Sequence, residues 1–499
     1  MSLGIDDPAA RYRELAARYA PEDGQPSFEV HNPSTGDLLA RFPTHDAEHV
    51  DRVVAAARAA ARTWRAVPTR ERARLLKTVA QRLRDAADEI ATLESLEMGK
   101  TFLTARSYDM HVCAESFEFF GSLIENERGS FVPGAAIDSY SVREPYGVVA
   151  GIIPFNWPPI HTGAKLAPAL AAGNVVILKP PEQCPLSVLR VIEIVAEVVP
   201  ADVVQAVTGI GSVTGTALTG HPGIDRISFT GSPATARHVL HAAAEHFTGA
   251  LLELGGKNPL LVFDDADLEQ AVPTAVEASF MNQGQACTAA SRILVHESVA
   301  ARFTELFVKA VADLRMGDPL EADTELGPLV TSAHRDRVES YIEVGLAEGA
   351  HLAYRGERPA DPVLAGGYFV APHVLDGVTP QMRVAQEEIF GPVATILTFR
   401  DLDEALEIAN GTEFALVAGV FTADPVLARR AADAIDAGVV FVNNYNRSFL
   451  PTTPFGGNRA SGYGREHVAE TLHEFSRIKS VRIANGLEPA PLSLRPGVR

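Results

Sequence analysis

Cys287 is the cysteine of this chain whose surroundings suit a nucleophile. It lies among amides, a glycine and small residues in 282–288 (Asn-Gln-Gly-Gln-Ala-Cys-Thr), on an expected turn before a strand over 291–295. A reactive thiol needs access to its substrate and help in reaching the thiolate form, and a polar turn allows both. A single cysteine is more often a small buried hydrophobe, so a structural role is the alternative.

Glu253 and Asn156 carry groups that a reaction at such a thiol would use. Glu253 interrupts an apolar strand expected over 250–254. Removal from water raises the pKa of a carboxylate there and makes it a usable base near neutral pH. Asn156 follows a strand expected over 147–153, and its amide can donate to an oxyanion. The alternatives are a glutamate bound to backbone N–H groups and an asparagine in a proline-flanked turn.

Two strand ends offer sites for a dinucleotide. Residues 229–232 (Phe-Thr-Gly-Ser) end a strand and open a helix, where free backbone N–H groups and the helix dipole favour a phosphate. Lys179 and Glu182 follow another strand, where a carboxylate can accept from both ribose hydroxyls of NAD. A solvated Lys–Glu pair is the alternative there. The glycine-rich dinucleotide fingerprint is absent, because Gly209 and Gly211 continue with the wrong spacing.

Strands that alternate with helices must position these residues. From residue 146, β-branched runs and amphipathic helical segments follow one another, which predicts a parallel, doubly wound sheet. Such a sheet binds ligands outside the carboxyl ends of its strands, where the candidate residues fall. The strands are expected at 147–153, 174–179, 203–208, 226–230 and 250–254, and the helices at 161–172, 186–199, 213–220 and 233–247.

A second α/β region is expected after the Gly255-Gly256 pair. Before the first region, residues 50–64 and 75–93 each carry a helical apolar stripe. Residues 139–143 alternate like an exposed strand, whose open edge would need a partner. The second region has expected strands at 259–263, 291–296, 393–399, 417–421 and 438–443, and helices at 267–283, 298–314, 332–348, 402–409 and 424–436.

Composition narrows the class of protein. The 499 residues carry a formal net charge of −19, which argues against a nucleic-acid or anionic-membrane partner. Three cysteines cannot form a disulfide framework and fit no zinc spacing, so we expect no metal and a reducing, cytoplasmic compartment. No apolar run approaches the roughly 20 residues that a membrane helix needs.

Seven short motifs follow one another along the chain, at 154–158, 173–180, 229–232, 252–259, 282–288, 387–392 and 454–457. In this order and spacing they resemble the aldehyde dehydrogenase superfamily, in its NAD(P)-dependent, non-phosphorylating branch. The resemblance covers about residues 25–485. It departs from the usual pattern at Ala236, where many members carry glycine after the phosphate motif.

The resemblance implies an α/β fold with two doubly wound parallel-sheet domains and a small β arm for oligomerisation. Residues 1–125 and 146–254 would form a Rossmann-like NAD-binding domain, and 255–454 the catalytic domain. Segments 126–145 and 475–486 would form the arm that pairs subunits into a homodimer or homotetramer. A loosely ordered tail, 487–499, would follow.

The resemblance also implies a role for each site residue. Cys287 would be the nucleophile, Asn156 an oxyanion donor together with the backbone N–H of Cys287, and Glu253 the base for deacylation, with Glu466 behind it. NAD is the expected cofactor, with NADP as an alternative. Lys179 and Glu182 would bind the adenosine ribose, Ser232 a phosphate and Glu388 the nicotinamide ribose. Phe390 would pack at the nicotinamide end, and Pro154 and Gly231 complete the expected cofactor contacts.

The substrate tunnel follows from the same motif positions. It would be lined by Trp157, His161, Phe449 and Phe455, with Ala164 where some members have a bulky aromatic residue, and with Arg447 at the mouth. Aromatic walls suit apolar or aryl aldehydes, whereas His161 and Arg447 suit a polar or anionic tail. The sequence therefore leaves the aldehyde open.

The expected reaction is oxidation of an aldehyde to its carboxylic acid. Cys287 would add to the carbonyl, hydride would pass to the nicotinamide, and Glu253 would activate the water that releases the acid. Two other classes stay open. One is a cysteine hydrolase or acyltransferase, which needs a base beside the thiol; the other is a non-catalytic protein on the same fold. Formation of NADH on adding aldehyde separates the three.

Overall fold

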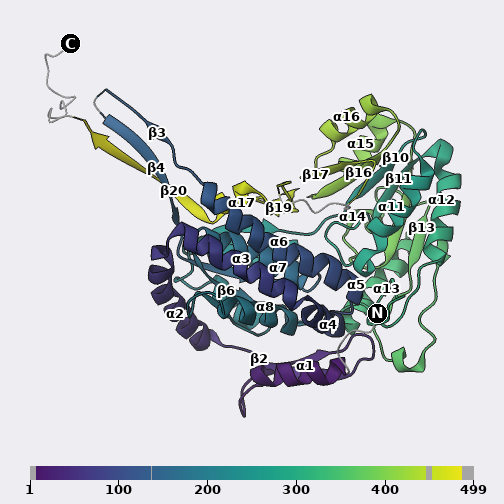
Figure 1. Ribbon diagram of the computed structural model, residues 1–499. Helices are drawn as coiled ribbons and strands as arrows, with labels where there is room; N and C mark the ends of the chain where they lie inside the picture. The colour runs from purple at the N-terminus through teal and green to yellow at the C-terminus, as the bar shows by residue number, and fades with distance from the viewer. Residues whose placement is uncertain (1–6, 136, 446–451, 486–499) are drawn as a thin grey trace.

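The computed structural model describes residues 7–135, 137–445 and 452–485. Two α/β units lie side by side, and a narrow three-stranded arm projects from the first of them (Figure 1). Their apolar cores divide near the predicted boundary at Gly255-Gly256, because one core draws mainly on residues 50–254 and two others on residues 260–455. The α/β class with two parallel-sheet units is thereby confirmed.

A six-stranded sheet forms the first unit. Its five main strands are parallel, as their β-branched runs predict, and central strands β5 and β6 are buried on both faces. The sequence pattern does not predict β19, a two-residue strand that pairs antiparallel with the end of β9. In spatial order the strands are β19 (Gly462–Tyr463), β9 (Gly249–Glu253), β8 (Arg226–Thr230), β5 (Val148–Ile152), β6 (Val175–Lys179) and β7 (Val204–Ala206).

Two helical layers cover this sheet. One layer contains α2 (Ala47–Ala66), α9 (Thr216–Thr219) and α10 (Pro233–Ala244). The other contains α3 (Thr69–Asp85), α6 (Met110–Leu123), α7 (Pro158–Ala171) and α8 (Leu186–Ala196). Because both faces of the sheet are covered, the ends of its strands are the places where it can meet a ligand.

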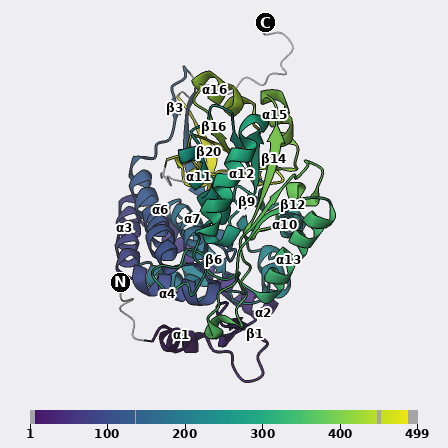
Figure 2. The ribbon, with the colours of Figure 1, turned by 90° about the vertical axis from the view of Figure 1, so that its right-hand side faces the viewer.

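A seven-stranded sheet forms the second unit. Successive side chains of its strands point to opposite faces: Leu260 and Val262 enter the core under α11 (Leu268–Phe280) and α12 (Glu297–Ala312), while Leu261 enters the core on the other side. Figure 2 shows α11 and α12 in front of the sheet. In spatial order the strands are β12 (His351–Arg355), β13 (His373–Asp376), β14 (Val393–Phe399), β11 (Arg292–His296), β10 (Pro259–Val262), β16 (Val417–Phe421) and β17 (Val439–Val442).

The far face of this second sheet carries α13 (Ser332–Ala347), α15 (Leu402–Asn410) and α16 (Pro425–Ala434). These helices lie within two residues of their predicted bounds. The pattern does not predict β12 and β13. The strand β12 is an antiparallel edge strand, and its side chains are mostly exposed, so they carry no apolar alternation.

The arm is a three-stranded antiparallel sheet of β3 (Phe131–Val132), β4 (Ile137–Pro145) and β20 (Ser476–Ala484). The sequence interpretation of residues 139–143 as an open edge is wrong. β4 is the central strand, paired with β20 along its whole length and with β3 at Ser139 and Tyr140. The pairing brings together the two segments predicted to form the arm, whose outer strands are β20 and the two-residue β3 (Figure 1).

The N-terminal region also differs from the two predicted stripes. Helix α1 (Pro8–Ala16) and a hairpin of β1 (Ser27–His31) and β2 (Leu38–Pro43) precede α2. The stripe over 75–93 is divided at Ala86 between α3 and α4 (Ala87–Met98), because the backbone leaves helical geometry there. The short elements are α5 (Phe102–Thr104), α14 (Arg383–Gln386), α17 (Ala469–Glu474), β15 (Phe414–Ala415) and β18 (Asn458–Arg459). The 3-10 turns are η1 (Ala17–Tyr19), η3 (Ile124–Asn126), η5 (Met281–Gly284) and η6 (Pro362–Leu364), and the π-helical turns are η2 (Ala105–Asp109) and η4 (Gly211–Gly215).

None of the helices within the described ranges is both long and apolar enough to cross a membrane.

Candidate active site

Two cavities meet at Cys287. The larger one, of about 840 Å³, lies at the carboxyl ends of the strands of the first sheet, and a smaller one, of about 360 Å³, lies on the other side of the cysteine. Cys287 lines both. The larger cavity is also lined by every residue that the sequence predicts for catalysis or cofactor binding, namely Pro154, Asn156, Lys179, Glu182, Gly231, Ser232, Glu253, Glu388 and Phe390.

Asn156 is positioned by the turn that leads from β5 into α7. Its side chain is buried, and its backbone carbonyl accepts a hydrogen bond from the Asn282 amide at 3.0 Å. Asn282 has a positive φ of 53°, a strained conformation for a residue other than glycine, just before the Cys287 turn. This contact ties the expected oxyanion donor to the segment that carries the expected nucleophile.

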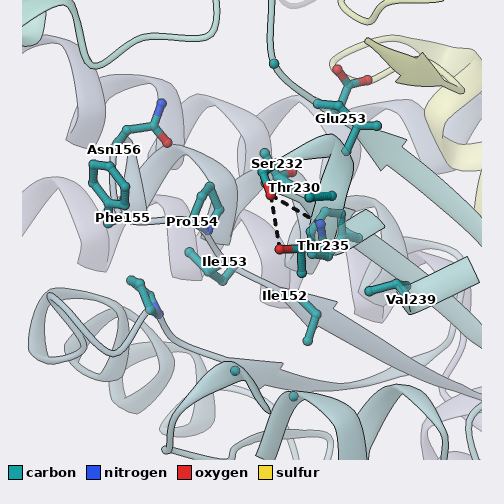
Figure 3. Close-up of a pocket in the computed structure, with 18 of the residues that line it drawn as sticks. Ile152, Ile153, Pro154, Phe155, Asn156, Thr230, Ser232, Thr235, Val239 and Glu253 are labelled. Carbon is teal, nitrogen blue, oxygen red and sulfur yellow. Dashed lines mark hydrogen bonds between the residues drawn. The ribbon is translucent and has the colours of Figure 1, made fainter. Parts of the chain in front are cut away.

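Ser232 is the N-cap of α10. Its hydroxyl accepts from the backbone N–H of Thr235 at 3.2 Å, and Pro233 occupies the first turn (Figure 3). A Cβ added at Gly231 would lie 2.7 Å from the Phe229 ring, so only glycine fits there. The helix begins at Pro233 and contains Ala236 as a buried residue, so it accommodates alanine where many members of the family carry glycine.

Lys179 and Glu182 form an ion pair at 2.9 Å at the end of β6. The lysine is only 3% exposed and also donates to the Pro180 carbonyl at 3.0 Å, so the lysine end of the pair is buried. The Glu182 side chain is 34% exposed and lines the larger cavity. The carboxylate therefore faces both solvent and the cavity.

Glu253 ends β9, and its carboxylate is buried. Neither of its oxygens has a hydrogen-bond partner among the described residues. Burial, and secondarily the nearby Glu466, raises the pKa of Glu253 well above its usual range. A carboxyl group in this state holds its proton near neutral pH and becomes a strong base once it loses it.

Lys165 is a site residue that the sequence reasoning missed. Its ammonium group, fully buried in α7, donates to Thr230 Oγ1 at 2.7 Å and to Ser228 Oγ at 3.2 Å, and pairs with Glu466 at 3.4 Å. The signal that could have found it is a lysine inside a helix whose other residues are all uncharged or weakly basic, and all buried. Its partner Glu466 lies behind Glu253, where the resemblance to the family places it.

Contacts to the backbone carbonyl of Cys287 fix the position of this residue. The carbonyl of Cys287 accepts from the Asn258 amide at 2.7 Å, and a Cβ at Gly256 would come within 2.7 Å of the same oxygen. Burial raises the pKa of the Cys287 thiol, and the carboxylates of Glu388 and Glu253 raise it further. With its pKa raised in this way, the thiol keeps its proton near neutral pH and loses it only as the pH rises.

Glu388 and Phe390 approach from the second unit. Glu388 accepts from the backbone N–H of Gly256 at 3.0 Å, and burial raises its pKa to about 7. Phe390 has a φ of 64° and packs edge-on against Phe155. The backbone carbonyl of Phe390 lies 2.7 Å from the His334 ring. Both residues thus sit where the two units close the larger cavity.

The smaller cavity contains three of the four predicted substrate residues, Trp157, His161 and Phe455. Phe449 and Arg447 lie outside the described residues. Ala164 is buried in α7 and is not among the residues that line this cavity. Among the described residues of the predicted tunnel, this cavity therefore brings together Trp157, His161 and Phe455 but not Ala164.

A buried ionic cluster behind Trp157 has no counterpart in the sequence predictions. Lys100, Glu94 and Asp109 are all fully buried, and the Lys100 ammonium pairs with both carboxylates. The same ammonium lies 4.0 Å from the centre of the Trp157 ring, a cation–π contact. Burial, followed by Glu94, raises the pKa of Asp109 well above its usual range.

Within the described part of the chain, no group of three or more His, Cys, Asp and Glu side chains is placed to hold a metal ion. The residues that line the larger cavity include an ion pair, the residues at a helix N-terminus and a buried carboxyl group, that of Glu253.

Comparisons with known proteins show the family of this chain. The sequence model of the aldehyde dehydrogenase family matches residues 19–481. An aldehyde dehydrogenase of Didymella fabae is 41% identical over 479 residues, which cover 96% of this chain and 97% of the relative.

Solved structures give the same result. A putative aldehyde dehydrogenase from Burkholderia cenocepacia is 43% identical, with a TM-score of 0.91 over 93% of this chain and 96% of its own. Betaine aldehyde dehydrogenase from Staphylococcus aureus, solved in complex with NAD+, is 33% identical, with a TM-score of 0.93 over 98% of this chain and 99% of its own. On the full-length match of the family and the shared fold, this chain belongs to the aldehyde dehydrogenase family.

Proposed function

We propose that this protein oxidises an aldehyde to the corresponding carboxylic acid with NAD+ as hydride acceptor, through a thiohemiacetal and a thioester on Cys287. The observation that carries the proposal is the position of Cys287 between two cavities. A thiol there can bond to a carbonyl carbon that enters from one side while a hydride acceptor lies on the other.

The larger cavity fits a dinucleotide. Gly231 lies close to the Phe229 ring and has no side chain, so no side chain covers the backbone beside the α10 N-terminus. This suits a phosphate. The Lys179–Glu182 pair suits a ribose with its two hydroxyls, and Glu388 suits a second ribose. When bound, NAD+ supplies the acceptor for the hydride that leaves the substrate carbon.

The chain's own residues then have separate tasks. The Cys287 thiolate bonds to the carbonyl carbon, and the oxyanion accepts from the Asn156 amide and the Cys287 backbone N–H. Loss of hydride leaves a thioester. Glu253 takes a proton from water, the hydroxide oxygen bonds to the acyl carbon, and the C–S bond breaks to release the acid and the thiolate.

The alternative of a cysteine hydrolase needs a base hydrogen-bonded to the thiol. His161 shares the smaller cavity with Cys287, yet neither of its ring nitrogens has a hydrogen-bond partner among the described residues. Burial also lowers the pKa of His161 well below its usual range, which weakens it as a base. These observations favour the dehydrogenase.

Absorbance of NADH after mixing protein, NAD+ and a panel of aldehydes tests the proposal. We expect one NADH and one carboxylic acid per aldehyde consumed. Release of acid from an ester without NADH would favour the hydrolase, and no reaction with any aldehyde would favour the non-catalytic alternative.

We further propose that the protein is a homodimer or homotetramer joined through the arm, and that it works in the cytoplasm. The division into an NAD-binding domain over 1–125 and 146–254 and a catalytic domain over 255–454 stays a prediction.

A further inference from the structure

His161 is a buried polar side chain without a partner. It is 5% exposed, and neither Nδ1 nor Nε2 has a hydrogen-bond partner among the described residues. His161 lines the smaller cavity, as does Cys287. Because buried polar atoms are nearly always hydrogen-bonded, a partner for this ring is expected inside the cavity.

The chemistry of that partner follows from the charge of the ring. Burial lowers the pKa of His161 well below its usual range, and Lys165, His467 and Lys100 lower it further. The neutral imidazole has one donor and one acceptor nitrogen. A hydroxyl group can satisfy either one, whereas a carboxylate can only accept.

The walls of the cavity disfavour an anion. Glu466 lines the cavity, and no lysine or arginine does so among the residues that the structure describes. The ammonium groups nearest to His161 are already paired, Lys165 with Glu466 and Lys100 with Glu94 and Asp109. An uncharged polar group is therefore the better match.

The same cavity accepts a flat ring. Tyr108 packs edge-on against Trp157 at 5.5 Å between ring centres, and Phe455 lines the cavity as well. Aromatic walls favour an aryl group, and a volume of about 360 Å³ suits a small one.

From these observations we propose that His161 is a specificity residue that hydrogen-bonds an uncharged hydroxyl group of the substrate, so that hydroxylated aryl aldehydes are the preferred substrate class. The proposal rests on the proposed aldehyde oxidation. A substrate that lacks the hydroxyl would leave the buried imidazole unpaired and bind less well.

The test compares two aldehydes of nearly equal shape, 3-(hydroxymethyl)benzaldehyde and 3-ethylbenzaldehyde, and repeats the comparison with the 4-substituted pair. These alcohols stay uncharged across the assay range. For the better-fitting pair we expect the hydroxyl to raise kcat/KM about tenfold, chiefly through KM, because the contact forms on binding and persists in the transition state. The same aldehydes bearing a carboxylate should be poorer substrates than either.

His161→Phe removes both nitrogens and keeps an aromatic ring, so it should bring the hydroxymethyl-to-ethyl ratio close to one. His161→Gln keeps a donor and an acceptor and should restore part of the ratio. Ile160→Val changes a neighbouring wall residue without changing polarity and should leave the ratio at its wild-type value.

NADH production from 3-ethylbenzaldehyde or 4-ethylbenzaldehyde reports on the proposed function separately from this inference. If the ethyl compounds are oxidised but both ratios are near one in the wild type, His161 does not select a hydroxyl. The inference also fails if His161→Phe keeps a raised ratio, or if the carboxylate compounds are preferred, which would point to a cation at the cavity instead.

Discussion

The side chain of Asn258 holds the backbone of Cys287 in place. Its amide donates to the Cys287 carbonyl at 2.7 Å and to the Ala289 carbonyl at 3.0 Å. Its oxygen accepts from the backbone N–H of Val417 at 3.2 Å. One buried amide at the start of β10 therefore connects the turn of the expected nucleophile to β16 in the sheet behind it.

Replacing Asn258 should therefore reduce turnover without removing any reacting group. Asn258→Asp keeps the acceptor for Val417 but loses both donors to the cysteine turn. We expect kcat to fall at least tenfold, because small misplacements of a nucleophile have effects of this size. Steady-state kinetics with a thermal melt would check this. Unchanged kcat in a folded variant would show that the turn holds its shape without Asn258.

Cys287→Ala should abolish dehydrogenase activity and leave NAD binding intact. Loss of a covalent nucleophile removes the thioester route, so turnover should fall below about 1% of wild type, which corresponds to more than about 2.7 kcal/mol. NADH formation and a titration with NAD would be measured on the same preparation. Cys184→Ala is the matched control, since Cys184 is buried in a separate small core cluster and should not be required for turnover.

Glu253→Gln should slow deacylation more than hydride transfer. The amide cannot take a proton from water, but it keeps the shape of the side chain. Rapid mixing should therefore show a burst of about one NADH per active site, followed by slow turnover. A slow first turnover with no burst would place Glu253 before hydride transfer.

The raised pKa values of Glu253 and Cys287 also predict the pH dependence of the rate. Each group works in its deprotonated form, and a raised pKa keeps the proton on at neutral pH. The kcat/KM should therefore rise as pH increases above neutral. A rate profile from mildly acid to alkaline pH would show it, and a rate that falls over this range would contradict both assignments.

Glu182→Gln should reduce the preference for NAD over NADP. Two negative charges about 4 Å apart repel by about 4 kcal/mol at an effective dielectric constant of about 20. Lys179 and solvent offset part of this repulsion, because Glu182 is paired and partly exposed. We expect a ten- to hundredfold preference for NAD in the wild type, about 1.4 to 2.8 kcal/mol. Comparing kcat/KM for both cofactors decides the matter; an unchanged ratio in the variant would remove Glu182 from the ribose site.

The free edge of β20 should join subunits. Ile478 and Ile483 are exposed on this strand, at 65% and 52%, where a second copy could cover them. Light scattering should give a dimer or tetramer, and Ile478→Lys with Ile483→Lys should shift it toward the monomer. Phe247→Lys, which changes a 96% exposed residue away from the arm, serves as the control. A wild-type monomer at micromolar concentration would exclude this assembly.

The sequence predicts the site well where one residue follows a strand. Asn156, Lys179, Ser232 and Glu253 each come at or just after the end of a parallel strand, and parallel topology places all such ends at one edge. Local periodicity is therefore enough to bring these residues together before any side-chain contact is known.

Contacts between distant segments could not be predicted in this way. Lys165 and Glu466 are 301 residues apart, and no local pattern shows that they form an ion pair behind Glu253. The strand partner of residues 139–143 lies in β20, so the sequence pattern shows an exposed strand but not which edge stays free. The two-residue strand β19 is too short to produce an alternation at all.

The pairing of β4 with β20 also determines when the arm can form during synthesis of the chain. Arg143 and Ser476, which meet across this pair, are 333 residues apart. During synthesis on a ribosome, β4 emerges early and waits while the whole second unit is made. Contacts of such long range form late in folding. A truncated chain that ends before β20 would lack the strand whose edge is free, so assembly through the arm would select for chains that have been made through β20.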